Sequence, residues 1–223
     1  MTGFQDADAV ARYAEAPPRL VPGFHDMQRM VAVLLAEHVP DAGRVLVLGA
    51  GGGLETKVFA AAYPGWRFDG VDPSQPMLDL AAQSLRDYAD RVSLHHGDIG
   101  AAPDGPFDAA VCLLTMHFIP LAERRPTLQA IRRRLKPGAP FVSMHHSIPG
   151  DGAERATWFS RFAAFAVSSG VAPENMENAA KTMSERLAIL TPTQDEALLH
   201  EAGFTGIEPF YAAFTFRGWI ALA

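Results

Sequence analysis

A run of small residues follows a short apolar segment early in the chain. Val45–Leu48 is continuously apolar, and five small residues follow it directly, beginning with Gly49, Ala50 and Gly51. A buried strand that ends in such a turn lets a ligand approach the backbone closely, because glycine lacks a Cβ and readily adopts positive φ. The glycines alone leave three ligands open: a dinucleotide, a nucleoside triphosphate or a sulfonium cofactor.

The residues after the turn separate these ligands. The dinucleotide fingerprint requires glycine at its first, third and sixth positions, and the sixth position here is Leu54. The phosphate-binding loop of nucleoside triphosphatases requires Gly-Lys-Ser/Thr, which does not follow. The remaining pattern is Gly-x-Gly-x-Gly, formed by Gly49, Gly51 and Gly53, and it leaves room for an extended ligand.

Acidic residues follow the next two predicted strands. Asp72 ends one of them, where a carboxylate can accept hydrogen bonds from both hydroxyls of a ribose; it could equally cap the next helix. Asp98 can accept from an exocyclic amine while Ile99 covers a purine face, although Gly-Asp is also an ordinary turn. Ligands of open α/β sheets lie at the carboxyl ends of the strands, so the three turns together predict an adenosine site.

Short apolar runs alternate with amphipathic segments between residues 45 and 145. Strands are predicted over 45–48, 67–71, 92–96, 107–114 and 141–145, and helices over 56–63, 77–88 and 123–135. Strands that are separated by helices and short loops indicate a parallel, doubly wound α/β sheet. Continuous apolar strands agree with this, because helices cover both faces of such a sheet.

Other patterns flank this alternation. An amphipathic helix is predicted over 26–38, after weak helical periodicity in residues 1–16 and an extended, proline-rich segment at 16–24. Residues 154–190 are predicted to be mostly helical, and a further helix is predicted over 192–202. Segments 207–216 and 218–223 are predicted strands that lie close in sequence, which indicates an antiparallel pair at the edge of the sheet.

Composition and charge narrow the function classes. The chain has 223 residues, 48% of them hydrophobic, which suffices for the core of one domain of moderate size. The formal net charge is −6, so no broad basic field favours nucleic acid. The single cysteine, Cys112, lies in an apolar run and is expected to be buried. Neither a signal peptide nor a membrane-spanning segment is recognisable, so a soluble cytoplasmic protein is expected.

The motifs, taken in order, resemble those of a known superfamily. The chain contains VLVLGAGGG, FDGVDPSQPMLDLA, HHGDI, FDAAVCLLTMHFI and LKPGAPFV, which are similar to the successive motifs of class I S-adenosylmethionine (SAM)-dependent methyltransferases. The resemblance covers about residues 43–145 and implies a Rossmann-like, mostly parallel sheet of seven strands. The implied strand order is 3-2-1-4-5-7-6, with an antiparallel last strand.

The resemblance also implies which residues hold SAM. The glycine turn would face the methionine part of the cofactor, Asp72 the ribose, and Asp98 with Ile99 the adenine, while Leu113 would lie beneath the sulfonium. The implied cofactor-binding residues are Gly49, Ala50, Gly51, Asp72, Pro73, Met77, Asp98, Ile99, Leu113 and Leu114.

The same resemblance implies one methyltransferase domain over residues 1–223. Its expected parts are an N-terminal helical cap at 1–40, a cofactor-binding core at 43–148, a helical insertion or lid at 151–190, and a closing helix with antiparallel strands at 191–223.

A narrower similarity extends over both ends of the chain. VPGFHDMQRM, the stretch 158–190 and the C-terminal LLHEAGFTGIEPFYAAFTFRGWIALA are similar in layout to carboxy-SAM synthases, enzymes of tRNA wobble modification that use prephenate. This chain has Phe24 where that family has tyrosine and Leu113 where it has asparagine. Lys181 and Arg186 lie near the family's carboxylate-binding arginine without aligning to it. These departures favour ordinary methyl transfer.

Methyl transfer requires mainly alignment of the acceptor with the methyl group, because the sulfonium leaves as a neutral sulfide. A general base helps with a hydroxyl or protonated amine. His117, His145 and His146 lie where such a base is expected, near the ends of the fourth and fifth strands. His117 could instead be a packed loop residue, and the other two capping residues. The candidate substrate and lid residues are Phe24, Arg29, Trp158 and Phe162, of which the aromatic ones could simply be core. No metal site is predicted, because no ligand spacing motif supports one.

The predicted function is therefore SAM-dependent methyl transfer to a small molecule or nucleoside, with S-adenosylhomocysteine (SAH) as the other product. Two alternatives remain: a carboxy-SAM synthase-like enzyme, and a protein that binds SAM without turnover. No nucleic-acid or membrane partner is expected, and a homodimer is compatible with the sequence.

Overall fold

A computed structural model describes residues 13–176, 183 and 187–223, and its centre is one seven-stranded sheet. The strand order is β3-β2-β1-β4-β5-β7-β6, which confirms the implied order. The strands are β1 (Arg44–Leu48), β2 (Arg67–Asp72), β3 (Val92–His96), β4 (Ala109–Leu113), β5 (Pro140–His146), β6 (Thr205–Ala213) and β7 (Phe216–Leu222).

The sheet is parallel from β3 to β5 and changes direction at β7. β1 pairs in parallel with both β2 and β4, so three carboxyl ends meet beside the turn that follows β1. β7 runs antiparallel to β5 and to β6, as predicted for two strands that are close in sequence. The adenosine site predicted from the turns after β1, β2 and β3 therefore has its residues on one edge of the sheet.

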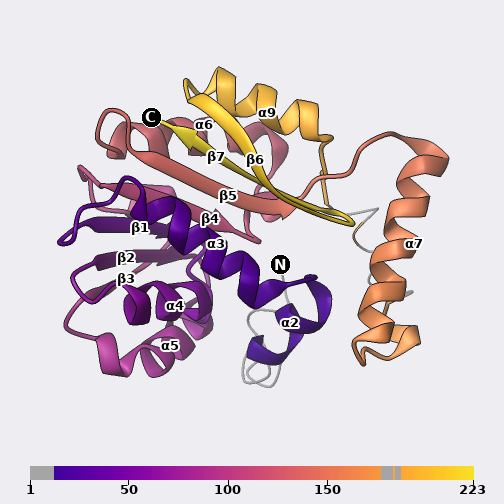
Figure 1. Ribbon diagram of the computed structural model, residues 1–223, viewed down its shortest axis with the longest axis horizontal. Helices are drawn as coiled ribbons and strands as arrows, with labels where there is room; N and C mark the ends of the chain where they lie inside the picture. The colour runs from indigo at the N-terminus through magenta and orange to yellow at the C-terminus, as the bar shows by residue number, and fades with distance from the viewer. Residues whose placement is uncertain (1–12, 177–182, 184–186) are drawn as a thin grey trace.

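Helices cover both faces of the sheet (Figure 1). α3, α4 and α5 lie on one face, α6 and α9 on the other, and α7 stands beyond the end of β5. The α-helices are α2 (Ala16–Leu20), α3 (Phe24–Ala36), α4 (Leu54–Ala62), α5 (Gln75–Ser84), α6 (Leu121–Arg134), α7 (Gly152–Ser168) and α9 (Pro192–Glu201). The short 3-10 turns are η2 (Tyr13–Glu15), η3 (Arg86–Tyr88), η4 (Ile99–Ala101) and η5 (Met116–Phe118).

Alternate residues of each central strand enter two separate cores. In β1, Val45 and Val47 pack with α3 and α4, while Leu46 and Leu48 pack with the α6 and α9 layer. All four are at most 5% exposed, which explains why the strand is apolar without alternation. Cys112 is fully buried in the second core, as predicted.

Two secondary-structure predictions were wrong in part. The proline-rich segment 16–24 was expected to be extended, but it contains the helix α2, because proline is tolerated in the first turn where no intrahelical N–H is needed. The predicted helical region 154–190 includes α7 and helical residues at 173–176, but residues 187–190 are not helical. The predictions for residues 1–12, 177–182 and 184–186 fall outside the described residues.

In the part of the chain that the structure describes, no helix is both long enough and apolar enough to cross a membrane.

Candidate functional site: a cofactor edge at the ends of β1, β2 and β4

The turn after β1 has the backbone conformation that its glycines permit. Gly49, Gly51 and Gly53 have φ of 76°, 50° and 79°, a region that residues with a Cβ rarely adopt. The amide of Gly49 donates to the carbonyl of Val71 at 2.8 Å, which ties the turn to β2. A Cβ placed on Gly49 would lie 2.0 Å from Oγ1 of Thr115, so the turn also touches the loop after β4.

The carboxylate of Asp72 joins the turn to the start of α5. Its Oδ2 accepts from the amide of Gly51 at 2.9 Å, and its Oδ1 accepts from the amide of Ser74 at 2.9 Å. Ser74 is the N-cap residue of α5, because its hydroxyl accepts from Met77, so Asp72 is not the cap. Burial raises the pKa of Asp72, while the two amide hydrogen bonds lower it. Each carboxylate oxygen can accept a second bond, as a ribose would require.

The end of β3 provides a second acidic residue. Asp98 is exposed, and its Oδ1 accepts from the amide of Gly100 at 2.7 Å, which makes it the N-cap of η4. Its Oδ2 can accept from an adenine amine. Ile99 is half-buried beside it. Asp98 can therefore cap η4 with Oδ1 and accept a hydrogen bond from adenine with Oδ2 at the same time.

The remaining predicted cofactor positions vary in exposure. Ala50, Met77 and Leu113 are at most 5% exposed, Leu114 is half-buried and Pro73 is exposed. Leu114 has a φ of 55°, which is uncommon for leucine and marks a sharp turn directly after β4. The site as a whole fits SAM: a turn that a Cβ would obstruct, a buried carboxylate and an apolar wall at one sheet edge.

Glu55 is a part of this region that sequence reasoning missed. It lies in the first turn of α4 and is 7% exposed. Burial, helped by the negative charge of Asp72, raises its pKa to about 8, so it holds a proton at neutral pH. The only sequence signal was its place directly after the glycine turn, and an acid in the first turn of a helix is usually exposed.

Two histidines meet beyond the ends of β4 and β5. The Nδ1 of His117 accepts from the amide of His146 at 3.4 Å, and the two ring centroids lie 4.8 Å apart. His146 also pairs with the Thr215 hydroxyl at 2.9 Å and stacks on Phe216. Burial lowers the pKa of His117 well below its usual value and that of His146 to about 3, so both rings are neutral at physiological pH.

His145 lies on the other face of β5, because successive strand residues point to opposite faces. Its Nε2 is 3.2 Å from Oδ1 of Asp195 on α9, and its ring packs against Trp219. Of the two histidines predicted at the end of β5, the structure therefore brings His146 and not His145 together with His117.

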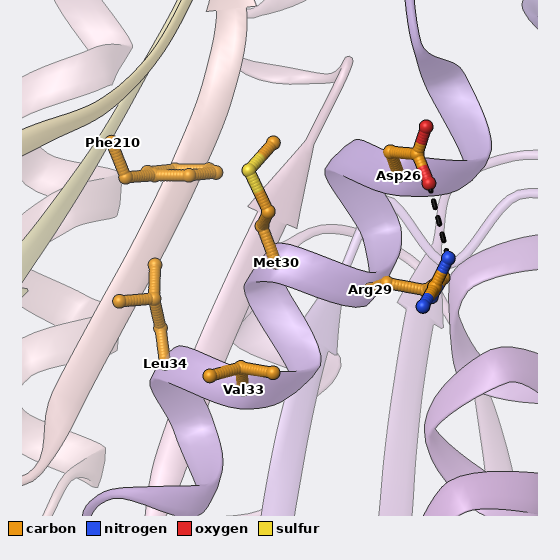
Figure 2. Close-up of a pocket in the computed structure, with 6 residues that line it drawn as sticks. All are labelled: Asp26, Arg29, Met30, Val33, Leu34 and Phe210. Carbon is orange, nitrogen blue, oxygen red and sulfur yellow. Dashed lines mark hydrogen bonds and ion pairs between the residues drawn. The ribbon is translucent and has the colours of Figure 1, made fainter.

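The predicted substrate and lid residues do not form one cluster. Phe162 is buried against His146 and Phe216, beside the histidine pair. Trp158 packs with the small core under α7, and Phe24 lies in the main core. Arg29 is exposed, pairs with Asp26 at 3.2 Å and lines a groove between α3 and β6 (Figure 2). A contact of these residues with substrate stays a prediction.

The profile of a methyltransferase domain family matches residues 46–141, from β1 into β5. Carboxy-S-adenosyl-L-methionine synthase of Chromohalobacter salexigens is 26% identical over 97% of this chain and 82% of its own length. The synthase of Dichelobacter nodosus is 24% identical over 97% and 91%.

The chain contains a methyltransferase domain, and its similarity to the named synthases extends over nearly the whole chain. Among solved structures, human N-acetylserotonin methyltransferase in complex with SAM has a TM-score of 0.67 and 16% identity. An O-methyltransferase family protein from Burkholderia thailandensis has a TM-score of 0.70 and 15% identity. This methyltransferase covers 57% and 61% of those two chains, so their similarity concerns the fold.

The described residues contain no group of three or more His, Cys, Asp or Glu side chains that could hold a metal ion.

The contact between Gly49 and Thr115 generates the first test. Gly49→Ala should weaken SAH binding at least about tenfold and reduce the free energy of unfolding by about 1–3 kcal/mol, because the new Cβ displaces Thr115. Gly138→Ala is the matched control, since Gly138 has a φ of 75° and nothing within 4 Å of the added Cβ. Titration calorimetry measures the SAH affinity, and urea unfolding measures the free energy of unfolding. Equal effects of the two substitutions would contradict the steric argument.

The protonated state of Glu55 generates a pH test. The folded state holds this proton more tightly than the unfolded state does, so the stabilisation is complete below pH 4.5 and disappears as pH rises through about 8. Glu55→Gln cannot lose a proton, so its stability relative to wild type should rise by about 1.4 kcal/mol per pH unit between these limits. Urea unfolding from pH 5.5 to 8.5 measures this. Parallel curves for the two proteins would contradict burial of a protonated Glu55.

Proposed function

We propose that this methyltransferase moves the methyl group of SAM to a hydroxyl or amine of a small, largely apolar molecule. The supporting observation is the neutral wall at the ends of β4 and β5, made of His117, His146, Phe162 and Phe216. All four side chains are at most 6% exposed, and the pKa directions leave both imidazoles uncharged. Such a wall favours an uncharged acceptor, because burying an unpaired charge against it would be costly.

The two imidazoles would orient the acceptor. Because Nδ1 of His117 accepts a backbone N–H, the ring holds its proton on Nε2, where it can donate to a lone pair of the acceptor. The lowered pKa of His117 makes it a weak proton acceptor. Catalysis would therefore rest on alignment and on exclusion of water. Bound SAM would supply the activated methyl group.

The protein would hold SAM along the edge described above. The turn Gly49–Gly51 would lie against its methionine part, Asp72 would accept from the ribose hydroxyls, and Asp98 from the adenine. Met77, Ile99 and Leu113 would provide apolar contact. A role for His145 at the reacting atoms has no geometric support, since it faces Asp195 on the opposite side of β5.

A second candidate is carboxy-SAM synthesis. The observation that favours it is the similarity to the named synthases over 97% of this chain. The buried leucine at position 113 and the uncharged histidine wall are less suited to a substrate with two carboxylates, which would require a cation nearby.

Cofactor binding has a direct test. Titration calorimetry with SAH should show binding, and Asp72→Ala should weaken it by at least about tenfold, because a charge-assisted pair of hydrogen bonds is lost. Asp79→Ala is the control, since Asp79 is an exposed acid on α5 that bonds only to Gln75 among the described residues. Absence of heat at millimolar SAH would overturn the proposal.

Mass spectrometry separates the two candidate reactions. The protein is incubated with SAM and a panel of phenols, amines and nucleosides, and separately with SAM and prephenate. Methyl transfer predicts an acceptor heavier by one methylene unit together with SAH. A carboxylated cofactor in the prephenate sample would instead favour the synthase. A protein that binds SAH and forms neither product would support binding without turnover.

A further inference from the structure

The turn between β6 and β7 has an unusual backbone conformation. It consists of Phe214 and Thr215, and Phe214 has a φ of 48°. Two-residue hairpin turns usually have glycine or asparagine where φ is positive, because a residue with a Cβ is strained there. A bulky residue keeps such a conformation only where the surrounding structure holds it. The contacts of the turn are therefore expected to be strong ones.

Thr215 connects this turn to the end of β5. It is fully buried, and its carbonyl accepts from the amide of Ser147 at 2.8 Å. Its hydroxyl lies 2.9 Å from Nδ1 of His146, and the ring of Phe216 stacks on the ring of His146 with the centroids 4.1 Å apart. The turn therefore contacts both a ring nitrogen and a ring face of His146, so a shift of the turn would reorient this imidazole.

Arg217 binds the carbonyls on both sides of Thr215. Its Nη1 donates to the carbonyl of Phe214 at 2.8 Å and to the carbonyl of Phe216 at 2.7 Å. Hydrogen bonds from a guanidinium are charge-assisted and about twice as strong as those between neutral groups. Because one nitrogen binds both carbonyls, it fixes the path of the chain between them and hence the place of the Thr215 side chain.

The same guanidinium contacts α7, the helix that contributes Phe162 to the neutral wall. Its Cζ lies 5.5 Å from the centroid of the Trp158 ring, within the range of a cation–π contact. Trp158 and Phe162 are one helical turn apart on α7 and share a face of it. The ring of Phe162 in turn lies 5.8 Å from that of Phe216. Arg217 and its neighbour Phe216 thus connect the hairpin to α7.

We infer that Arg217 is a positioning residue for the neutral wall, and this inference rests on the proposed role of that wall in holding the acceptor. Arg217 fixes the turn, the turn places the hydroxyl of Thr215, and that hydroxyl orients the ring of His146. With Nδ1 of His146 occupied by Thr215, its Nε2 is the nitrogen left for an acceptor. Arg217 acts through these groups and does not need to touch the acceptor itself.

Nuclear magnetic resonance of the His146 imidazole tests this role directly. Thr215→Val keeps the side-chain shape and removes the hydroxyl, so the nitrogen resonance of His146 Nδ1 should shift. Arg217→Met keeps a long side chain beside Trp158 and removes both hydrogen bonds to the turn, and it should shift the same resonance in the same direction. The double variant should give no larger shift than Thr215→Val alone, because both changes act through one hydrogen bond.

Arg161→Met is the matched control. Arg161 is exposed, and its Cζ lies 4.6 Å from the centroid of the same Trp158 ring, but it has no hydrogen bond to the hairpin among the described residues. Its removal should leave the His146 resonance unchanged. Urea unfolding establishes that each variant is folded, and calorimetry should give Arg217→Met the SAH affinity of wild type, because its contacts lie on the acceptor side.

Three results would overturn the inference. The first is a folded Arg217→Met with wild-type His146 resonances, and the second is an equal shift in Arg161→Met. The third is loss of SAH binding by a folded Arg217→Met, since the effect would then extend beyond the wall. If wild type forms no methylated product, the proposed function fails, whereas the resonances of His146 still decide whether Arg217 orients this ring.

Discussion

The close approach of the turn after β1 to the loop after β4 is the constraint on which the rest of the site depends. Gly49 has no space for a Cβ because Thr115 fills it, and its positive φ excludes most other residues. The contact exists because β1 and β4 are neighbours in the sheet, although more than sixty residues separate them in the chain. The predicted cofactor positions at the ends of β1, β2 and β4 lie around this contact.

Burial controls the charges around this edge. Glu55 is protonated, and the rings of His117 and His146 stay neutral. Burial raises the pKa of Asp72, against two amide hydrogen bonds that lower it. The proposed acceptor side, at His117 and His146, is thus uncharged, whereas the proposed ribose side carries the acid Asp72. An uncharged acceptor suits the first side, because burying an unpaired charge there would be costly.

The relatives bear on the class of enzyme, whereas the geometry of the site bears on the acceptor. Similar sequences and similar folds agree on a SAM-dependent methyltransferase. The named synthases match nearly the whole chain, yet the residues that would meet a transferred group include the apolar Leu113. The proposal for the acceptor therefore rests on the neutral wall at the ends of β4 and β5 and not on the fold, since one fold can host many reactions.

The sequence by itself predicted the parallel sheet, because apolar strands separated by helices are local signals, and the family resemblance implied the strand order that the structure confirms. The cofactor positions at the strand ends stay a prediction from glycine spacing and acids. The sequence could not determine that Pro17 and Pro18 lie in the helix α2, since proline suits both an extended chain and the first turn of a helix. Only the tertiary structure decided that His117 meets His146 and not His145, and that Glu55 is buried. These facts depend on which face of a strand meets which helix, and residues distant in sequence set the burial that shifts each charge.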